Sequence, residues 1–327
     1  MNKYDKHIIG MDIGGTNLRF GVMSEDGVIK NSRSFPLNKY DEDNMSRQVD
    51  FITQQAKRFL EDVKIYGAEA AGVGIAGQID HKTGNILFSP NLNWRNVPLK
   101  KILEKETGLR VNVANDLTAI TYGEWKFGAG RGENDLVCIF VGTGIGSGIV
   151  INGSLYVGCS NVAGEIGHIT VVSGGRKCTC GNSGCLEAYA GGWGIAEIIK
   201  ERALQDSVGF KDIIRIAGGI DNISAETLAD AYRERDGNAV KLVEEIGRYL
   251  SDGVITSVNF INPCAIVMGG GVIDGIPDLL DIVNEEVHRR ALKASVSNIK
   301  ILKAGLGKDS GIIGAAGLAA MYFKTHI

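Results

Sequence analysis

The residues of this 327-residue chain that say most about its chemistry are one histidine and three cysteines in a short stretch. His168 is followed by Cys178, Cys180 and Cys185. An imidazole and three thiolates form a complete ligand set for tetrahedral zinc. The loop between the outer ligands is too short to fold around a core of its own, so a bound metal would hold it in place. Redox chemistry of the thiols is the alternative.

A carboxylate stands on each side of this cluster. Glu165 lies three residues before His168, and Glu187 lies two residues after Cys185. Bound zinc would fix both carboxylates in space, and the second ring nitrogen of His168 would remain able to hydrogen-bond a ligand. The arrangement indicates a clamp for a polyhydroxylated molecule.

Two glycine-rich turns, at 12–17 and 142–148, each follow a predicted strand and have features of a phosphate-binding loop. Glycine lets backbone N–H groups point toward an anion, and the carboxylate of Asp12 could hold Mg²⁺ through water. An ordinary hairpin is the alternative for either turn, although four glycines in seven residues exceed what the second hairpin needs. Glycines after a later strand leave room for a flat adenine, or make a turn before a helix. The residues predicted to contact a nucleotide are Asp12, Gly14, Gly15, Thr16, Asn17, Gly142, Thr143, Gly144, Gly146, Gly269, Gly270 and Gly271.

Asn115 and Asp116 follow another predicted strand, and strand tips of open α/β sheets are where ligands bind. Asp116 is the candidate catalytic residue, because phosphoryl transfer to an alcohol needs a carboxylate within hydrogen-bond reach of the hydroxyl. The amide of Asn115 can both donate to and accept from a neighbouring hydroxyl. Capping of the helix that follows is the alternative role of this pair. Asn91 offers a further amide for sugar hydroxyls, or belongs to a polar surface loop.

Strands and helices that alternate along the whole chain must position these groups, and this alternation is typical of α/β proteins. Both halves show the order strand, glycine-rich turn, strand, at Asp12 and again at Gly142. The segment 77–96 is predicted to be a long polar loop. The predicted strands are 7–12, 18–23, a third strand from Val28, 70–75, 109–114, 136–141, 149–151, 265–268 and 299–303. The predicted helices are 43–63, 99–107, 117–125, 193–205, 225–235, 237–260, 276–291 and 311–322.

The composition is that of a soluble globular protein, with 44% hydrophobic and 22% charged residues. A formal net charge of −3 does not indicate binding to nucleic acid or to an acidic membrane. The chain begins with charged residues rather than an apolar signal, and it contains no apolar stretch long enough to span a bilayer. Three of the six cysteines lie outside the cluster, so a secreted disulfide framework is not expected and we predict a cytoplasmic protein.

With these motifs placed, the chain resembles the ROK family, which comprises repressors, open reading frames and sugar kinases. The segments that carry the resemblance are 12–17, 163–168 and 178–187, and the segment 90–99 looks most like the glucokinase branch of the family. The resemblance implies an α/β, two-domain RNase H-like fold of the actin-like ATPase and hexokinase type, with a zinc-binding loop at 164–187. The implied domains are 1–117 with 305–327, and 118–304, closing over ATP and sugar.

The resemblance also implies that Asp116 takes the proton from the 6-hydroxyl of a sugar. The implied sugar-binding residues are Gly77, Asn91, Asn115, Asp116, Glu165, His168 and Glu187. The expected activity is ATP:D-glucose 6-phosphotransferase, with ATP, Mg²⁺ and structural Zn²⁺ as cofactors, in a homodimer or homotetramer.

Three alternatives remain open at this point. The substrate could be another hexose, such as N-acetylglucosamine, N-acetylmannosamine, mannose or fructose, because the space around the sugar's 2-substituent cannot be read from the sequence. A sugar-sensing regulator of the same family would carry a DNA-binding module before the first phosphate motif, where only 11 residues precede Asp12. An actin-like ATPase would share the glycine turns but would have no need of the zinc loop.

Overall fold

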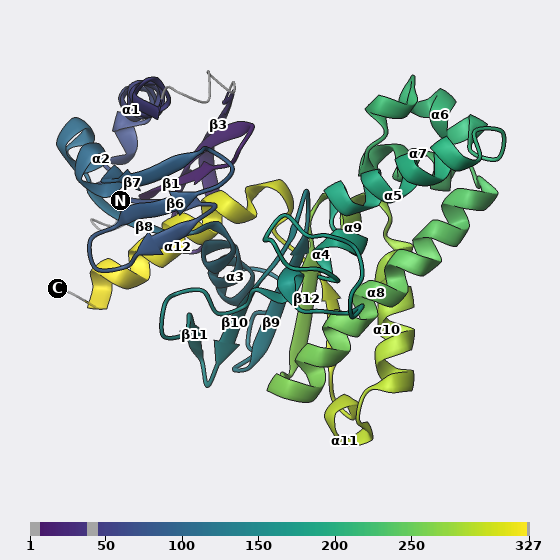
Figure 1. Ribbon diagram of the computed structural model, residues 1–327. Coiled ribbons are helices and arrows are strands. Elements are labelled where there is room, and N and C mark those ends of the chain that lie inside the picture. Colours follow the sequence, from purple (N-terminus) through teal and green to yellow (C-terminus); the bar gives the residue numbers. More distant parts are fainter. Residues whose placement is uncertain (1–6, 38–44, 326–327) are drawn as a thin grey trace. The chain divides into compact units, whose positions relative to one another are not determined.

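The computed structural model describes residues 7–37 and 45–325 (Figure 1). They form two compact units. Unit 1 contains the described residues up to Gly132, Leu155–Ala163 and those from Gly305 onward, and unit 2 contains Glu133–Ser154 and Gly164–Ala304. These units show which residues pack together and do not test domain bounds. The predicted bounds 1–117 with 305–327 and 118–304 therefore stay a prediction. Residues 1–6 and 326–327 of those domains, and residues 43–44 of the first predicted helix, lie outside the described residues.

The two large sheets repeat one strand order. In unit 1 the order is β3-β2-β1-β4-β8, with β1, β4 and β8 parallel and β2 antiparallel to β1. The other sheet has the order β11-β10-β9-β12-β13, with β9, β12 and β13 parallel and β10 antiparallel to β9. The duplicated strand–turn–strand plan expected from the sequence is therefore confirmed. The strands are β1 (Ile8–Ile13), β2 (Asn17–Met23), β3 (Ile29–Pro36), β4 (Ala70–Ile75), β8 (Arg110–Asn115), β9 (Leu136–Val141), β10 (Ile145–Ile151), β11 (Ser154–Tyr156), β12 (Ala265–Gly269) and β13 (Lys300–Lys303).

Helices complete each unit, and each unit has its own apolar core. The longer predicted helices are present, whereas the short helices α4, α6, α9 and α11 were not predicted because so few turns leave little periodicity to detect. The helices of unit 1 are α1 (Met45–Asp62), α2 (Leu99–Thr107), α3 (Asp116–Lys126) and α12 (Ser310–Thr325). Those of unit 2 are α4 (Glu187–Ala190), α5 (Gly192–Gln205), α6 (Lys211–Ala217), α7 (Ala225–Arg233), α8 (Gly237–Ile261), α9 (Gly271–Gly275), α10 (Asp278–Arg290) and α11 (Lys293–Val296).

The prediction of a polar loop at 77–96 is wrong. The segment forms most of a small antiparallel sheet of β5 (Gln78–Asp80), β6 (Asn85–Ser89) and β7 (Trp94–Val97). Its buried apolar side chains are separated by polar ones, so the strands are too short and too mixed to stand out in the sequence. Trp94 is fully buried and donates its indole N–H to Gln48 (2.6 Å), so this ring belongs to the core.

Helix α12, yellow in Figure 1, packs directly on the backbone of the first sheet. A Cβ atom at Gly72 of β4 would lie 1.8 Å from the carbonyl oxygen of Ala315, and one at Gly10 of β1 would lie 2.2 Å from that of Ile312. On its other face, Gly314 would place a Cβ 2.0 Å from the carbonyl oxygen of Ala119 in α3. Glycine therefore permits α12 to lie closely between the sheet and α3.

One buried carboxylate ties α3 to the segment that leads into α12. Glu124 is fully buried, and its two oxygens accept the N–H groups of Ala129, Gly305 and Leu306, each at 2.9 Å. Hydrogen bonds from several backbone donors satisfy a carboxylate that water cannot reach. Glu124 thus fixes the start of the last segment against the end of α3.

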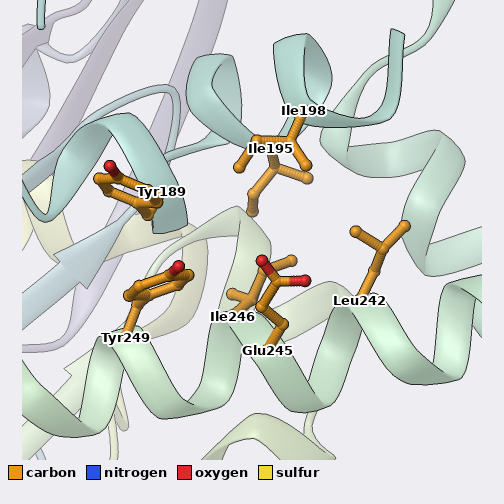
Figure 2. A pocket seen from close by; sticks show the side chains of 7 residues that line it. All are labelled: Tyr189, Ile195, Ile198, Leu242, Glu245, Ile246 and Tyr249. Atoms are coloured by element: carbon orange, nitrogen blue, oxygen red, sulfur yellow. The ribbon is translucent and has the colours of Figure 1, made fainter. Parts of the chain in front are cut away.

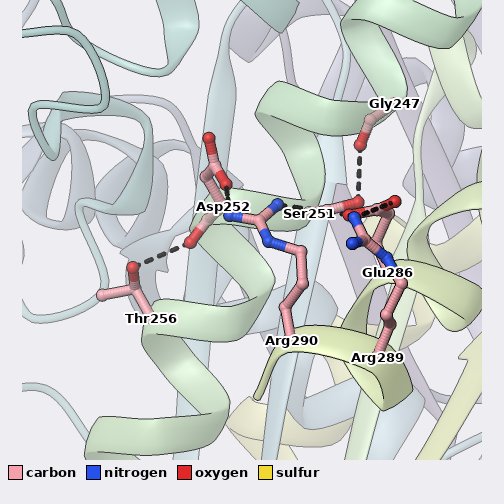
Figure 3. A network of polar contacts seen from close by, with 7 residues as sticks. All are labelled: Gly247, Ser251, Asp252, Thr256, Glu286, Arg289 and Arg290. Atoms are coloured by element: carbon pink, nitrogen blue, oxygen red, sulfur yellow. Dashed lines mark hydrogen bonds and ion pairs between the residues drawn. The ribbon is translucent and has the colours of Figure 1, made fainter.

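Helices α8 and α10 of unit 2 are joined at the surface by a polar network (Figure 3). Arg290 of α10 pairs with Asp252 of α8 and with Glu286 one turn earlier, and Arg289 also pairs with Glu286. Ser251 and Thr256 donate their hydroxyls to carbonyl groups of α8 itself. Such exposed pairs contribute little stability individually, so the apolar contacts beneath them hold this helix pair.

The contact between α12 and β4 gives a prediction about stability. We expect Gly72→Ala to lower the free energy of unfolding by about 3 kcal/mol, the upper part of the range for overpacking, because the obstructing atom is backbone. Urea denaturation followed by circular dichroism measures the change. Gly237→Ala is the matched control, since a Cβ there meets no atom within 4 Å. Equal stability of both variants would contradict the proposed packing constraint.

Candidate functional site

In unit 1, the predicted site residues gather at one edge of the first sheet. Because β1, β4 and β8 are parallel, their C-terminal ends lie together, with Ile13 beside Ile75 and Ile75 beside Asn115. Asp12 stands at the end of β1, Gly77 follows β4, and Asn115 ends β8. This is the edge at which open α/β sheets bind ligands.

Asp12 is half-buried and lies opposite Arg19 on β2. Burial raises the pKa of the Asp12 carboxyl, and the guanidinium of Arg19 opposes that shift. A Cβ on Gly311 would lie 2.6 Å from the carboxyl carbon of Asp12, so the first turn of α12 adjoins this group. The partial positive charge of a helix N-terminus favours a carboxylate there.

The first glycine turn is a tight connection between β1 and β2. The N–H of Gly14 donates to the carbonyl of Asn17 at 2.9 Å, and Thr16 and Asn17 are exposed. A Cβ on Gly15 would stand 3.4 Å from Cβ of Asn91, so the turn lies against that residue. The hairpin is therefore present, and it leaves a hydroxyl and an amide exposed beside Asn91, which is itself exposed.

Asn115 is the N-cap of α3, as the alternative interpretation proposed. Its Oδ1 accepts the N–H groups of Leu117 (2.9 Å) and Thr118 (3.2 Å), and its Nδ2 donates to the carbonyl of Gly77 (3.2 Å). Asp116 is half-buried, and its Oδ1 accepts the N–H of Leu117 at 2.9 Å. These bonds set the orientation of both side chains at the strand tip.

In unit 2, the second glycine turn is shorter than predicted. The N–H of Gly142 donates to the carbonyl of Gly144 at 2.9 Å, and β10 begins at Ile145. Gly146 lies inside β10, paired with Phe140, rather than in the turn. The pattern of alternate glycines continued into the strand and obscured where the turn ends.

The third group of glycines shares an edge with this turn. Strands β9 and β12 are parallel, and a Cβ on Gly270 would lie 2.5 Å from the carbonyl oxygen of Val141, the residue before Gly142. Gly269 ends β12, and Gly271 begins α9. Unit 2 thus brings both predicted nucleotide segments to one edge of its sheet.

The four predicted metal ligands come together in unit 2. The ligand atoms of His168, Cys178, Cys180 and Cys185 all lie within 4.8 Å of one another. His168 Nδ1 is 3.7 Å from Cys178 Sγ, and Cys180 Sγ is 3.7 Å from Cys185 Sγ. Tetrahedral zinc has edges of about 3.8 Å between sulfurs and roughly 3.6 Å between sulfur and nitrogen. The donor set therefore fits zinc, with Nε2 of His168 as the ring nitrogen that remains.

Backbone geometry supports the cluster. Cys178 donates its N–H to the carbonyl of Asn182 (2.9 Å), and Gly181 and Gly184 have positive φ angles of 94° and 81°. Burial raises the pKa of the Cys185 thiol to about 12, whereas the N–H of Asn182 lowers the pKa of Cys180. Zinc binds thiolates, so its binding would release protons from this cluster.

The two carboxylates beside the cluster differ in burial, although their positions in the sequence suggest the same role for both. Glu165 is exposed. Glu187 is buried, and its oxygens accept the N–H of Ile145 (2.8 Å) and the indole N–H of Trp193 (3.0 Å). Both oxygens of the Glu187 carboxylate are therefore already engaged within unit 2. Trp193 was not predicted as a site residue, and its only sequence signal is its place six residues after Glu187.

Unit 2 also contains a small apolar hollow, and none of the predicted site residues lines it (Figure 2). It lies beside the α4–α5 segment and α8, and Glu245 brings the one charged side chain to it. That carboxylate is already paired with Arg202. The hollow therefore offers no set of groups for phosphoryl transfer. It is lined by Tyr189, Ile195, Ile198, Leu242, Glu245, Ile246 and Tyr249.

Within 7–37 and 45–325, no helix combines the length and the apolar character that crossing a bilayer requires.

Comparison with known proteins gives one consistent family. A family model described as the ROK family matches residues 8–321. The glucokinase of Streptomyces coelicolor is 33% identical over 314 residues, covering 95% of this chain and 96% of that protein. A crystal structure of a ROK family glucokinase from Streptomyces griseus in complex with glucose and AMPPNP is 34% identical, with a TM-score of 0.82, covering 96% of this chain and 99% of that one. The xylose repressor of Bacillus spizizenii is 29% identical over 324 residues, covering 98% of this chain and 79% of that protein.

The cysteine cluster gives a prediction about metal content. We expect the purified protein to carry about one zinc ion per chain and Cys185→Ala to lose it, because three ligands no longer close the tetrahedron. Atomic absorption measures the zinc. Cys264→Ser, outside the cluster, is the control and should keep its metal. Removing zinc should also lower the melting temperature, since structural zinc contributes on the order of 10 kcal/mol to local folding. A zinc-free wild-type protein with an unchanged melting temperature would refute the assignment.

Proposed function

Because the chain belongs to the ROK family, we propose that it is an ATP-dependent hexose kinase that phosphorylates the 6-hydroxyl of D-glucose. The observation that carries the proposal is Asp116, a half-buried carboxylate oriented at the tip of β8. The glucokinase of Streptomyces coelicolor and the Streptomyces griseus glucokinase with glucose and AMPPNP support it.

The proposal gives the sugar a set of polar groups in each unit. In unit 1 these are Gly77, Asn91, Asn115 and Asp116, which the strand ends and the start of α3 position. In unit 2 they are Glu165, Nε2 of His168 and Glu187, beside the zinc ligands. Amides and carboxylates suit sugar hydroxyls because they offer directional acceptors and donors at fixed positions.

The nucleotide is assigned to the glycine turns. Gly14, Gly15, Thr16 and Asn17 in unit 1, and Gly142, Thr143 and Gly144 in unit 2, would present backbone N–H groups and hydroxyls to the phosphates. Gly269, Gly270 and Gly271 would lie against adenine. Gly146 sits in β10, so we propose for it a supporting place in the strand. Asp12 would hold Mg²⁺, which shields charge on the triphosphate as the phosphoryl group moves.

Asp116 would act as the general base. The 6-hydroxyl oxygen attacks the γ-phosphorus in line, its proton passes to the Asp116 carboxylate, and the bond to the β-phosphate oxygen breaks to leave ADP. Exclusion of water matters for this reaction, because hydrolysis would otherwise compete with transfer to the sugar.

We further propose that the protein is cytoplasmic and forms a homodimer or homotetramer. Light scattering would test the oligomeric state.

The relatives leave a second candidate function. The xylose repressor covers nearly all of this chain but also has residues beyond the match. A regulator that senses sugar would bind hexose with the same unit 1 and unit 2 residues and would not need ATP turnover. Sugar-dependent ADP production favours the kinase, and sugar binding with no turnover would favour the regulator.

The role of Asp116 is tested by Asp116→Asn. We expect kcat to fall by at least about 10²-fold, the lower range for losing a general base, while glucose still binds. Asparagine keeps the oxygen that accepts the N–H of Leu117, so the local fold should persist. A coupled ADP assay gives kcat, and calorimetry gives glucose affinity. Asp26→Asn, in the turn between β2 and β3, is the control. Turnover close to wild type would remove Asp116 from the mechanism.

The identity of the sugar is tested by a panel in the same assay. We expect the highest kcat/KM with D-glucose, lower values with mannose and fructose, and the lowest with N-acetylglucosamine and N-acetylmannosamine. A hydrogen-bonding site rejects sugars that leave its polar groups unpaired. Omission of Mg²⁺ should abolish turnover in every case. A higher kcat/KM for another hexose would keep the reaction type and replace glucose as substrate.

A further inference from the structure

Glu187 joins three segments of unit 2 through a single carboxylate. It is the first residue of α4, and its oxygens accept the backbone N–H of Ile145, where β10 begins, and the indole N–H of Trp193 in α5. The side chain is 9% exposed, so water competes little with these two bonds. Hydrogen bonds to a buried ionised group are strong and costly to leave unmade.

The backbone around Glu187 is built to keep it in this position. A Cβ on Gly144 would lie 2.3 Å from Glu187 Oε2, so glycine leaves room for the carboxylate beside the second glycine turn. The first residues of α5 donate hydrogen bonds to two carbonyl groups of the same turn. Gly192 donates its N–H to the carbonyl of Gly142 (2.9 Å), and Trp193 donates its N–H to that of Thr143 (3.0 Å). Consequently, the Glu187–Trp193 pair and its backbone contacts fix the conformation of the turn at 142–145.

The other end of this connection is the metal cluster. Cys185 is a predicted zinc ligand two residues before Glu187, and the N–H of Ala188 donates to the carbonyl of Cys185 at 3.0 Å. Leu186, between them, donates its N–H to the carbonyl of Ile169 (3.0 Å), next to His168. Movement of Cys185 on loss of metal would therefore shift the start of α4 and the carboxylate with it.

We infer that Glu187 is a positioning residue that sets the glycine turn at 142–145 from the zinc cluster, and that Trp193 holds Glu187 in place. The inference rests on the proposed function only in taking this turn to receive ATP phosphates. It predicts that loss of zinc disturbs the nucleotide site as well as the sugar site. Trp193 acts through Glu187 and needs no contact with either substrate.

The first test uses Trp193→Phe, which keeps an aromatic ring and removes the indole N–H. We expect AMPPNP, titrated by calorimetry with Mg²⁺ and without sugar, to bind about tenfold more weakly to the zinc-loaded variant, as for loss of a hydrogen bond to a charged group. Tyr232→Phe is the matched control, because it removes a hydroxyl bond to Asp278 elsewhere in unit 2. Wild-type AMPPNP affinity in Trp193→Phe would overturn the role of Trp193.

The second test needs no ligand. Hydrogen exchange of the Ile145 amide, followed by mass spectrometry, should be at least about tenfold faster after chelation of zinc from the wild-type protein, and also in zinc-loaded Trp193→Phe. Chelation of zinc from Trp193→Phe should add little further, because coupled changes are not additive. Unchanged exchange at Ile145 after chelation would overturn the link to the metal. If AMPPNP fails to bind the wild type, the proposed function fails, while the exchange result still decides this inference.

Discussion

Direct contact between backbones, at positions where glycine removes the Cβ atom, is the constraint on which both units depend. In unit 1 it lets α12 lie against β1 and β4 through Gly10 and Gly72, and the same helix brings its first turn to Asp12. In unit 2 it brings Gly270 against the carbonyl of Val141, and the missing Cβ at Gly144 leaves room for the carboxylate of Glu187. The high glycine content of the chain, 45 of 327 residues, thus has a structural meaning beyond flexible turns. It fixes the spacing of the elements that present the polar groups.

Two buried carboxylates stabilise this packing through hydrogen bonds. Glu124 and Glu187 each accept N–H groups from segments distant in sequence, and neither is paired with a cationic side chain in the hydrogen bonds described. Backbone and indole dipoles stabilise such a charge without a second ion, so its position is set by several donors together. Asp116 differs, because at the tip of β8 it is only half-buried and accepts the N–H of the adjacent Leu117. Burial and several donors from distant segments therefore distinguish Glu124 and Glu187 from Asp116.

Much of this could be predicted from the sequence because the signals were local. Strand β4, helix α2 with its terminal Gly108, and the Asn115 cap follow from patterns a few residues long, and the ligand spacing around Cys185 indicates a metal cluster. The small sheet at 78–97 was missed because its short strands bury few residues each. The bonds of Glu187 were missed because a side chain's partners across 42 residues leave no trace in spacing. Trp193 was missed because a spacing of six residues from Glu187 does not by itself indicate a contact.

The membership of α12 in unit 1 has a consequence for synthesis on the ribosome. Helix α12 covers the bare glycines Gly10 and Gly72 of β1 and β4, so this part of the sheet stays uncovered until residues 310–325 have been synthesised. The later unit, complete once Ala304 has emerged, is the first able to reach its native core. Nascent chains would therefore carry a partly uncovered sheet until these residues are made. That sheet is where chaperones would be expected to act and where truncated products would aggregate.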